Sequence, residues 1–545
     1  MSNDRQDTTQ QQIARSAAII SIGNVLSRVM GLVRGIAISD LFGTEKAILA
    51  YTAASLVPRR LYELVIGGMI TSALVPTFSE YAAQEKRDAR GTRSVWHVAS
   101  LLFTLGALVL CVTTLILEIG APLLTRVLVS GFEVPLQRET TSLLRIALLG
   151  VVFLGLSGLA TALCQALQRF TLPAFTAVVF NASIVVAALV LGPRWGARGL
   201  VAGLVAGALL QFVLQLPALR DMRFRPTLDF RHPALRTIMR LYLPVVLGMI
   251  PNELGIALDR NLASRVGNSM AIMEYATQLI QFPLGLVSIA IATAILPALA
   301  RQAAQEQDGS APGAGAGSQG QAGFRATLAG GLRLVMVLTL PAAVGLLVLA
   351  EPVVALIFEH GAFKAIDTIQ TALALRFYLI GLVFAAVDQP LVFAFYARKN
   401  TLTPALVGVL GVFFYTLVAV PTYRTLGMVG LILGNGAQLA GHAVMMIWLF
   451  QRQVGTLRGY GIGQTLFKSS LAAVAMGVVV YGVTWVIERA LGQAVPAGGR
   501  AGWALQVALG GGAGLVVYLA LCARLRVREL ELLRQIGQRV RRTTR

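Results

Sequence analysis

Long apolar segments alternate with short polar ones along almost the entire chain. A helix needs about 20 apolar residues to cross the hydrocarbon core of a bilayer, and about fourteen segments reach that length. Their approximate extents are 15–40, 48–78, 95–117, 140–166, 173–192, 198–219, 241–265, 271–299, 326–350, 369–396, 403–422, 428–450, 465–488 and 501–523. The apolar stretch 119–132 is too short to span and is expected to lie at the membrane interface. The pattern predicts an all-α integral membrane protein with about 14 transmembrane helices.

Composition supports the same class. The 545 residues are 56% hydrophobic and 13% charged, whereas a soluble domain carries about 25% charged residues. The first apolar segment continues through Arg28 and Arg34 without a small-residue cleavage site. We therefore expect a retained membrane helix there and not a cleaved signal peptide.

Basic residues gather in every second loop, and the intervening loops hold mostly single charges. The basic loops carry Lys86, Arg87, Arg90 and Arg93; Arg220, Arg223, Arg225, Arg231 and Arg236; Arg398 and Lys399; and Arg452 and Arg458. Because Lys and Arg are retained on the cytoplasmic side, both termini are predicted to be cytoplasmic. This topology accounts for the net charge of +21, so no nucleic-acid partner is expected. The tail 525–542 is interpreted either as a basic amphipathic helix on anionic lipid or as an orientation signal.

An internal repeat links the two halves of the chain. Three pairs of segments are similar and keep their order: 73–84 with 294–305, 169–174 with 399–405, and 196–203 with 427–434. Chance similarity between Gly/Ala/Leu-rich helices is the alternative explanation. Because the second copy starts on the same side of the membrane as the first, the repeat is parallel. It predicts two six-helix lobes plus two C-terminal helices, with a transport pathway between the lobes.

The repeat and the loops divide the chain into four expected parts. These are an N-terminal lobe (1–220), a C-terminal lobe (221–455) with a flexible cytoplasmic linker (305–323), two last helices (456–523) and a basic cytoplasmic tail (524–545).

Charged residues inside the spans are functional candidates, because an ionised group in the membrane is costly unless it faces water or a partner. In the first segment Asn24, Arg28, Gly31 and Gly35 share one helical face, with Ser27 beside Arg28 and with Arg34 at the edge of the face. We expect this face to line a hydrated cavity. Snorkelling of the two arginines to an interface is the alternative.

Other candidates lie within later segments. The set comprises Arg59, Arg60 and Glu63, then Asn252, Glu253, Asp259 and Arg260, and finally Gln278 and Asp388. Glu63 is spaced to pair with Arg59 or Arg60, which is also compatible with a purely structural role. Since these charges are mainly basic, they suit an anionic substrate such as a pyrophosphate headgroup. No metal site, cofactor or catalytic residue is expected, because no ligand or nucleophile spacing occurs.

Several stretches resemble, in order, the MurJ (MviN) family of lipid II flippases. They are Ser27-Arg28-Val-Met-Gly31-Leu-Val-Arg34, Phe42-Gly43, Ala73-Leu-Val-Pro76, Gln168-Arg169-Phe-Thr-Leu-Pro173, Asp259-Arg260-Asn-Leu-Ala-Ser264, Leu296-Pro297, Phe358-Glu-His-Gly361-Ala-Phe363 and Phe395-Tyr396-Ala-Arg398-Lys-Asn-Thr401-Leu-Thr-Pro404. The resemblance covers almost the whole chain. It implies the fourteen-helix, two-lobed fold of the multidrug/oligosaccharidyl-lipid/polysaccharide exporter superfamily.

The resemblance also implies a function. Members flip an undecaprenyl-linked peptidoglycan precursor from the cytoplasmic to the outer leaflet by alternating access, and are located in the bacterial cytoplasmic membrane. Cavity arginines bind the headgroup, and Arg28, Arg34 and Arg260 match them. The last two helices, here 465–488 and 501–523, form a groove for the lipid tail. The chain departs from the family where Gly35, Leu49, Tyr62 and Gln278 stand at positions that are charged in many members; Arg59 or Arg60 is one turn from Tyr62.

Three other functions remain open from the sequence. A related transporter would carry another lipid-linked oligosaccharide or a drug cation, although a cation exporter would need more acids within its spans. A non-transporting scaffold would recruit wall-synthesis proteins through the basic loops and tail. An integral-membrane enzyme is the least supported, because no paired carboxylates or nucleophile motif occur at helical spacing.

Overall fold

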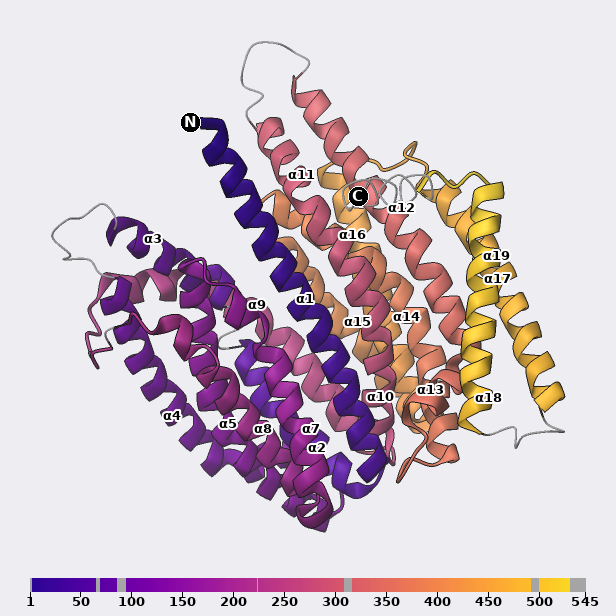
Figure 1. Ribbon diagram of the computed structural model, residues 1–545, viewed down its shortest axis with the longest axis horizontal. Coiled ribbons are helices and arrows are strands. Elements are labelled where there is room, and N and C mark those ends of the chain that lie inside the picture. The colour runs from indigo at the N-terminus through magenta and orange to yellow at the C-terminus, as the bar shows by residue number, and fades with distance from the viewer. Residues whose placement is uncertain are drawn as a thin grey trace. The chain divides into compact units, whose positions relative to one another are not determined.

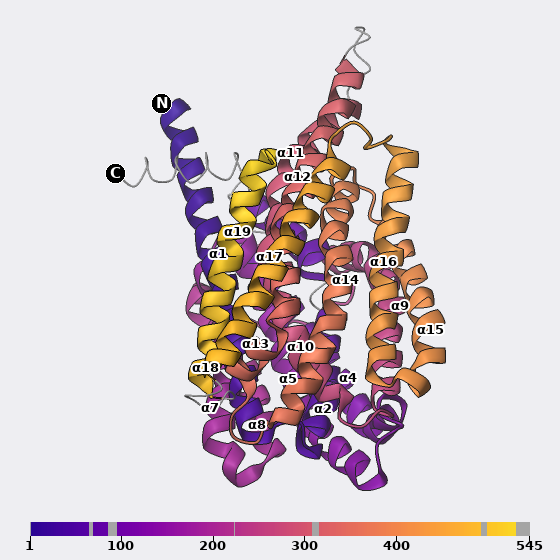
Figure 2. The same ribbon diagram turned by 90° about the vertical axis from the view of Figure 1, so that its right-hand side faces the viewer.

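The computed structural model describes residues 2–64, 69–85, 95–222, 224–307, 316–491 and 499–529. Across these ranges the regular structure is helical, with no strand. The chain divides into two compact units. Unit 1 comprises residues 1–271 and 360–363, and unit 2 comprises residues 272–359 and 364–545. Both are shown in Figures 1 and 2.

Unit 1 contains the indigo-to-magenta helices of Figure 1. They are α1 (Ser2–Phe42), α2 (Lys46–Tyr62), the π-helix η2 (Ile70–Leu74), α3 (Val75–Glu85), α4 (Val95–Leu128), α5 (Val134–Ala166), α6 (Thr171–Ala174), α7 (Thr176–Trp195), α8 (Ala197–Val213), the 3₁₀ turn η3 (Leu216–Leu219) and α9 (Pro233–Ala263). Its core includes an apolar cluster in which Phe78, Val98, Leu163 and Ile238 join α3, α4, α5 and α9.

Unit 2 continues through the helices toward the yellow end of the chain. They are α10 (Ser269–Pro283), the π-helix η4 (Leu284–Ile289), α11 (Ala290–Gln307), α12 (Ala316–Val348), α13 (Ala350–Phe358), α14 (Ala365–Ala397), α15 (Leu402–Leu426), α16 (Met428–Gln453), α17 (Ile462–Leu491), α18 (Arg500–Leu505), the π-helix η5 (Gln506–Gly510) and α19 (Gly511–Arg524). In Figure 2, α17 and α19 run side by side. Val337, Met476 and Tyr518 belong to the apolar cluster that joins α12, α17 and α19.

The predicted spans are confirmed as membrane-length helices. Twelve described helices are long and apolar enough to cross a bilayer, and the bent pair within α9 makes up to thirteen. The remaining predicted span, 48–78, is described as α2, η2 and α3 on the two sides of residues 65–68, which lie outside the described residues. The chain is therefore a multi-pass membrane protein.

Two local expectations change. The stretch 119–132 was expected to lie at the interface because it is too short to span; in the structure its residues up to Leu128 continue α4 without a break, and a turn follows at 129–133. The helices α11 and α12 also extend into the predicted linker 305–323, of which residues 308–315 lie outside the described residues. The predicted tail helix lies outside them from residue 530 onward.

The predicted repeat has a counterpart in local geometry. Two non-glycine residues in left-handed conformation, Gln168 (φ 62°) and Lys399 (φ 60°), precede α6 and α15. The turns between α7 and α8 and between α15 and α16 are made by Gly196 (φ 57°) and Gly427 (φ 58°). The distance along the sequence from Gln168 to Gly196 equals the distance from Lys399 to Gly427. Both units thus contain the same hairpin of two helices joined by a left-handed glycine.

Small residues bring the two helices of each hairpin together. In unit 1, Gly199, Gly203 and Gly207 recur every fourth residue along α8 and face α7. In unit 2, a Cβ on Gly434 would lie 2.7 Å from Ala419 Cβ and 3.1 Å from its backbone nitrogen. Such small-residue rows let helix backbones approach closely, which is a recurring means of helix association in membranes.

Candidate functional site

The basic face of α1 is connected to the interior of unit 1. Arg34 Nη1 donates a hydrogen bond to Asn181 Oδ1 of α7 over 2.9 Å. Asn181 is 8% exposed and its amide nitrogen donates to the Ala177 carbonyl. Arg28 and Ser27 are half-buried one to two turns earlier, and Asn24 is exposed. The guanidinium of Arg34 is therefore held between two helices of this unit.

Residues from α2 and α9 form a second polar group in unit 1. Arg60 Nη1 lies 2.8 Å from Glu63 Oε2, and both interact electrostatically with Glu253, which also hydrogen-bonds Asn252. The Tyr242 hydroxyl donates to the Leu64 carbonyl and ties α9 to the end of α2. The structure thus confirms the predicted pairing of Glu63 with Arg60 and brings it together with Asn252 and Glu253 of α9, which are distant in the sequence.

Arg59 and Tyr62 of α2 are neighbours of the Arg60–Glu63 ion pair but do not belong to it. Arg59 Nη2 is 3.5 Å from the Ser55 hydroxyl one turn earlier. Tyr62 packs against the apolar cluster of unit 1. Its ring therefore contributes to packing, whereas Arg59 and Arg60 supply the positive charge of this turn.

Asp259 and Arg260 lie near the end of α9. Arg260 Nε is 4.0 Å from Asp259 Oδ2, and the two side chains are 15% and 17% exposed. This end of the helix is fixed to the α4–α5 turn, because Asn261 Nδ2 donates to the Val127 carbonyl (2.6 Å) and Gly131 N donates to Ser264 Oγ (3.0 Å). Arg260 is thus held on a well-anchored helix end.

The two remaining candidates, Gln278 and Asp388, belong to unit 2. Among the described residues, Gln278 Oε1 is buried without a hydrogen-bond partner. Asp388 of α14 is paired with His442 of α16, with 2.8 Å between Oδ1 and Nδ1, and the side chains are 11% and 16% exposed. The two candidates do not form a common group with each other.

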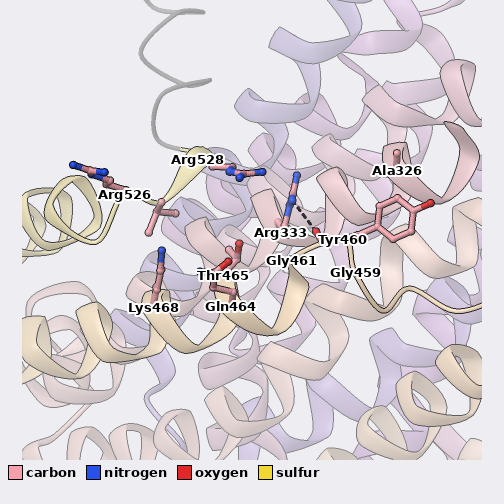
Figure 3. A pocket seen from close by; sticks show the side chains of 11 residues that line it. Ala326, Arg333, Gly459, Tyr460, Gly461, Gln464, Thr465, Lys468, Arg526 and Arg528 are labelled. Carbon is pink, nitrogen blue, oxygen red and sulfur yellow. Dashed lines mark hydrogen bonds between the residues drawn. The ribbon is translucent and has the colours of Figure 1, made fainter. Parts of the chain in front are cut away.

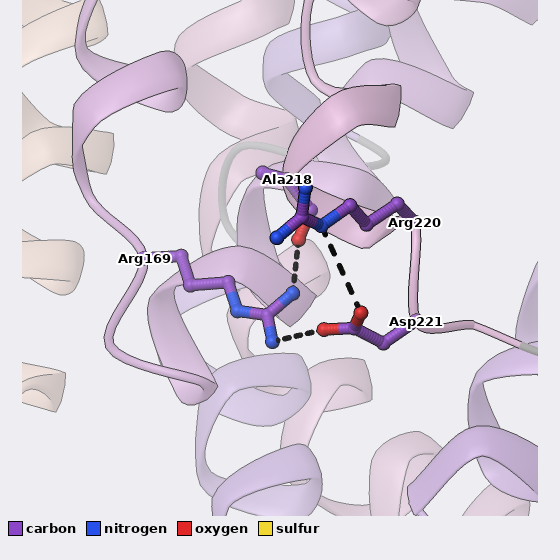
Figure 4. A network of polar contacts seen from close by, with 4 residues as sticks. All are labelled: Arg169, Ala218, Arg220 and Asp221. Carbon is purple, nitrogen blue, oxygen red and sulfur yellow. Dashed lines mark hydrogen bonds and ion pairs between the residues drawn. The ribbon is translucent and has the colours of Figure 1, made fainter.

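Sequence reasoning missed the partners in these pairs. Asn181 and His442 are polar residues within apolar spans, and that signal could have identified them. From the sequence, Arg169 was interpreted only as part of the repeat and of the family resemblance, and Arg220 only as an orientation signal. Figure 4 shows that Arg169 has a structural role: its Nη2 lies 2.6 Å from Asp221 Oδ2 and its Nη1 donates to the Ala218 carbonyl, while Arg220 Nε lies 3.9 Å from Asp221 Oδ1.

The charge balance of the unit 1 candidates favours an anion. Five arginines (Arg28, Arg34, Arg59, Arg60 and Arg260) accompany three acids (Glu63, Glu253 and Asp259). Guanidinium groups recognise phosphate through two parallel hydrogen bonds, and they retain their charge when buried. The candidates around Arg34, Arg60 and Arg260 thus carry more positive than negative charge.

Comparison with known proteins identifies the family. The family model described as lipid II flippase MurJ matches residues 38–496. The probable lipid II flippase MurJ of Haemophilus influenzae is 29% identical over 478 residues, which cover 84% of this chain and 90% of that protein. The corresponding protein of Vibrio cholerae is 30% identical over 417 residues, covering 74% and 76%.

Solved structures share the fold. A structure of lipid II flippase MurJ in an inward closed conformation has a TM-score of 0.76 at 20% identity, and the match covers 94% of this chain and 99% of that one. An inward-facing multidrug resistance MATE family transporter of the MOP superfamily has a TM-score of 0.64 at 16% identity, covering 81% and 99%. The predicted fold class and family resemblance are confirmed: the chain is a member of the MurJ family of lipid II flippases.

Proposed function

We propose that this chain flips lipid II, the undecaprenyl-linked peptidoglycan precursor, from the inner to the outer leaflet of the bacterial cytoplasmic membrane for cell-wall synthesis. The observation that carries the proposal is the family match over residues 38–496. The excess of arginines in unit 1 supports an anionic cargo, since an exporter of drug cations would need acids in those positions. Transport by alternating access is consistent with a chain that consists of two compact units.

In this proposal the headgroup pyrophosphate is bound by Arg28, Arg34 and Arg260, with Arg59 and Arg60 on α2. Asn24, Ser27, Glu63, Asn252, Glu253, Asp259, Gln278 and Asp388 have supporting roles. Two arrangements favour ligand binding over simple snorkelling: Arg34 is oriented by Asn181, and Arg260 is on an anchored helix end. Positioned guanidinium groups lose less conformational freedom when they bind a phosphate.

The lipid tail is proposed to lie along α17 and α18–α19. The outward side chains of α17 are apolar, with Phe467 71% exposed, Val474 59% and Val478 67%. A polyprenyl chain can cover such side chains without burying a polar group. The proposal also includes a division into two lobes at residues 220 and 455. Both termini are proposed to be cytoplasmic.

A rescue experiment tests the function. A bacterium depleted of its own flippase would carry this chain as the only replacement, with growth and lipid II accumulation as the measurements. We expect wild type to restore growth, and Arg28→Ala or Arg260→Ala to fail although the protein is inserted at normal levels. Arg198→Ala is the matched control, because Arg198 is an exposed arginine of unit 1 at the α7–α8 turn.

The possible outcomes separate function from site. Failure of correctly inserted wild type would contradict lipid II transport and favour another lipid-linked cargo or a scaffold that recruits wall-synthesis proteins. Full rescue by both arginine variants would retain the function but remove these residues from the binding site.

A further inference from the structure

Unit 2 contains a cavity of about 680 Å³ at the end where α17 begins and α19 ends. Its walls come from α12, from the loop 459–461, from the first turns of α17 and from the residues that follow α19. Both α17 and α19 are membrane-length helices. The cavity is therefore at the level where these spans leave the hydrocarbon core.

Four of the eleven lining residues are cationic and none is acidic. The cations are Arg333 of α12, Lys468 of α17, and Arg526 and Arg528 after α19. Figure 3 shows Lys468 extending from α17 toward the segment that carries Arg526 and Arg528. Because three separate segments direct positive charge to one cavity, the set is more than the basic end of a single helix.

One buried acid near the cavity, Glu529, has a structural role. Glu529 is 2% exposed and its Oε1 lies 2.8 Å from Arg333 Nε. Arg333 Nη1 also donates to the Tyr460 carbonyl over 2.7 Å. This pairing fixes the chain after α19 against α12, so that Arg526 and Arg528, on either side of the buried Val527, are held at the cavity. Among the described residues no carboxylate lies within 4.0 Å of Lys468, Arg526 or Arg528.

The glycine-containing loop before α17 leaves room for the cationic side chains of the cavity. Gly459 and Gly461 have φ values of 90° and 75°, which side chains other than glycine rarely adopt. A Cβ on Gly461 would lie 3.4 Å from Arg333 Nη1. Gln464, Thr465 and Lys468 follow on the same face of α17, and the positive end of the helix dipole adds to the cationic character.

The outer surface next to the cavity is apolar. On α17, Phe467 is 71% exposed and Leu471, one turn deeper than Lys468, is 51% exposed. A cationic cavity at the membrane boundary above apolar side chains fits the two parts of a phospholipid, the phosphate and the acyl chain. A free phosphate ion would use the cations alone.

We propose that this cavity is a binding site for the phosphate headgroup of an anionic membrane lipid, distinct from the unit 1 arginines proposed for the cargo headgroup, with its acyl chain on the same apolar face of α17 that is proposed for the cargo tail. Arg528, Arg526 and Lys468 contact the phosphate, and Arg333 is a positioning residue that holds Arg528 in place through Glu529. With the orientation proposed above, the lipid belongs to the cytoplasmic leaflet.

Native mass spectrometry of the purified full chain tests this site. The protein in detergent is titrated with phosphatidylglycerol, with phosphatidylcholine of the same acyl chains, or with inorganic phosphate. We expect one tight phosphatidylglycerol adduct that phosphatidylcholine does not replace. Lys468→Gln/Arg528→Gln should weaken this adduct about tenfold or more, since each cation near a lipid surface contributes about 1 kcal/mol.

The control variant loses the same number of positive charges at another place in unit 2. Arg301→Gln/Lys399→Gln removes two exposed cations of unit 2, and Gln is the residue found at the corresponding left-handed position 168. This variant should retain the adduct. If the Gln variant does not fold, Lys468→Arg/Arg528→Lys should retain the adduct and Arg526→Gln should weaken it.

Three results would overturn the proposal. They are equal affinity for the two lipids, an unchanged adduct in the Lys468/Arg528 variant, and binding of inorganic phosphate without preference for phosphatidylglycerol. The last result would assign the cavity to a soluble phosphate. Cell rescue is a separate measurement, so failure of the proposed transport function does not affect this result.

Discussion

Asp388 and His442 illustrate how single polar residues are accommodated inside unit 2. Their side chains are 11% and 16% exposed, and the 2.8 Å contact satisfies both in an otherwise apolar helix packing. Removing one partner of a buried pair leaves an uncompensated polar group, which typically costs about 3–5 kcal/mol. Replacing both by apolar residues avoids that cost.

We therefore predict that Asp388→Ala destabilises the detergent-solubilised protein by several kcal/mol, on the order of the cost of a broken buried pair. Asp388→Val/His442→Phe should be closer to wild type than either single variant. Denaturant unfolding of the four proteins measures the coupling. Additive single effects would show that the two side chains do not stabilise each other.

His232 is a second residue with a testable electrostatic role, outside the spans at the start of α9. Its Nδ1 accepts a hydrogen bond from Ala234 N over 3.2 Å, and its ring is 5.8 Å from the His97 ring and 5.9 Å from Tyr81. Burial, with a smaller contribution from His97, lowers the pKa of His232, and Asp229 opposes this shift. The folded protein thus favours the neutral ring, whose unprotonated nitrogen caps the helix.

The sign of the pH effect follows from this lowered pKa. The contribution of His232 to stability is present above the ordinary histidine pKa of about 6.5, and it is lost as the pH falls through the lowered value. We expect the unfolding midpoint to decrease between about pH 7 and pH 5 in wild type. His232→Asn, which retains a capping acceptor, should reduce this decrease. An equal pH dependence in both proteins would exclude His232 as its source.

At the scale of elements, the α15–α16 hairpin depends on the absence of a side chain at Gly434. A Cβ there would meet the Cβ and backbone nitrogen of Ala419, and helix backbone cannot move aside as a flexible side chain would. Overpacking of this kind costs about 1–3 kcal/mol. The same argument applies to the α7–α8 hairpin at Gly203.

We predict that Gly434→Leu lowers the unfolding midpoint and the yield of folded protein. Gly408→Leu, in α15, is the matched control because a Cβ at Gly408 meets no heavy atom within 4 Å. Thermal unfolding followed by size-exclusion chromatography compares the two. Equal loss in both variants would mean that leucine is disfavoured for reasons other than helix packing.

Most elements were predictable from the sequence, because each span is coded by a continuous apolar run that must satisfy its own backbone hydrogen bonds. The ends of the runs were less predictable. The helix α4 extends to Leu128, past the predicted limit of 117, since Glu118 and Gly120 do not prevent helix formation. The pairing of candidate residues was not predictable for a different reason: Arg34 meets Asn181 only after α1 and α7 have packed in a particular rotation.

At the scale of the molecule, the loop charges make a prediction about orientation. In a variant with Cys111, Cys164 and Cys522 replaced by alanine, single cysteines at Thr425 and Thr456 would probe opposite ends of α16, and both positions are exposed. We expect a membrane-impermeant maleimide to label Thr425→Cys in intact spheroplasts and Thr456→Cys only after lysis. The reverse pattern would contradict cytoplasmic termini.

The assignment of the family rests on similarity spread over most of the chain. The assignment of the binding site rests on a few residues. The family match extends over residues 38–496, so it does not depend on single positions such as Tyr62 and Gln278. Tyr62 packs against the apolar cluster of unit 1, so a tyrosine at this position is accommodated by the helix packing. Fold and family were therefore more predictable than the set of residues that bind the cargo.

The matched hairpins also constrain how this chain can evolve. The segments from Gln168 to Gly196 and from Lys399 to Gly427 have the same length although their sequences differ widely. One inserted or deleted residue would rotate everything beyond it by about 100° and shift it by about 1.5 Å. Gly203 of α8 and Gly434 of α16 would then turn away from the helix that each contacts. These hairpins should therefore accept many substitutions but no change in length.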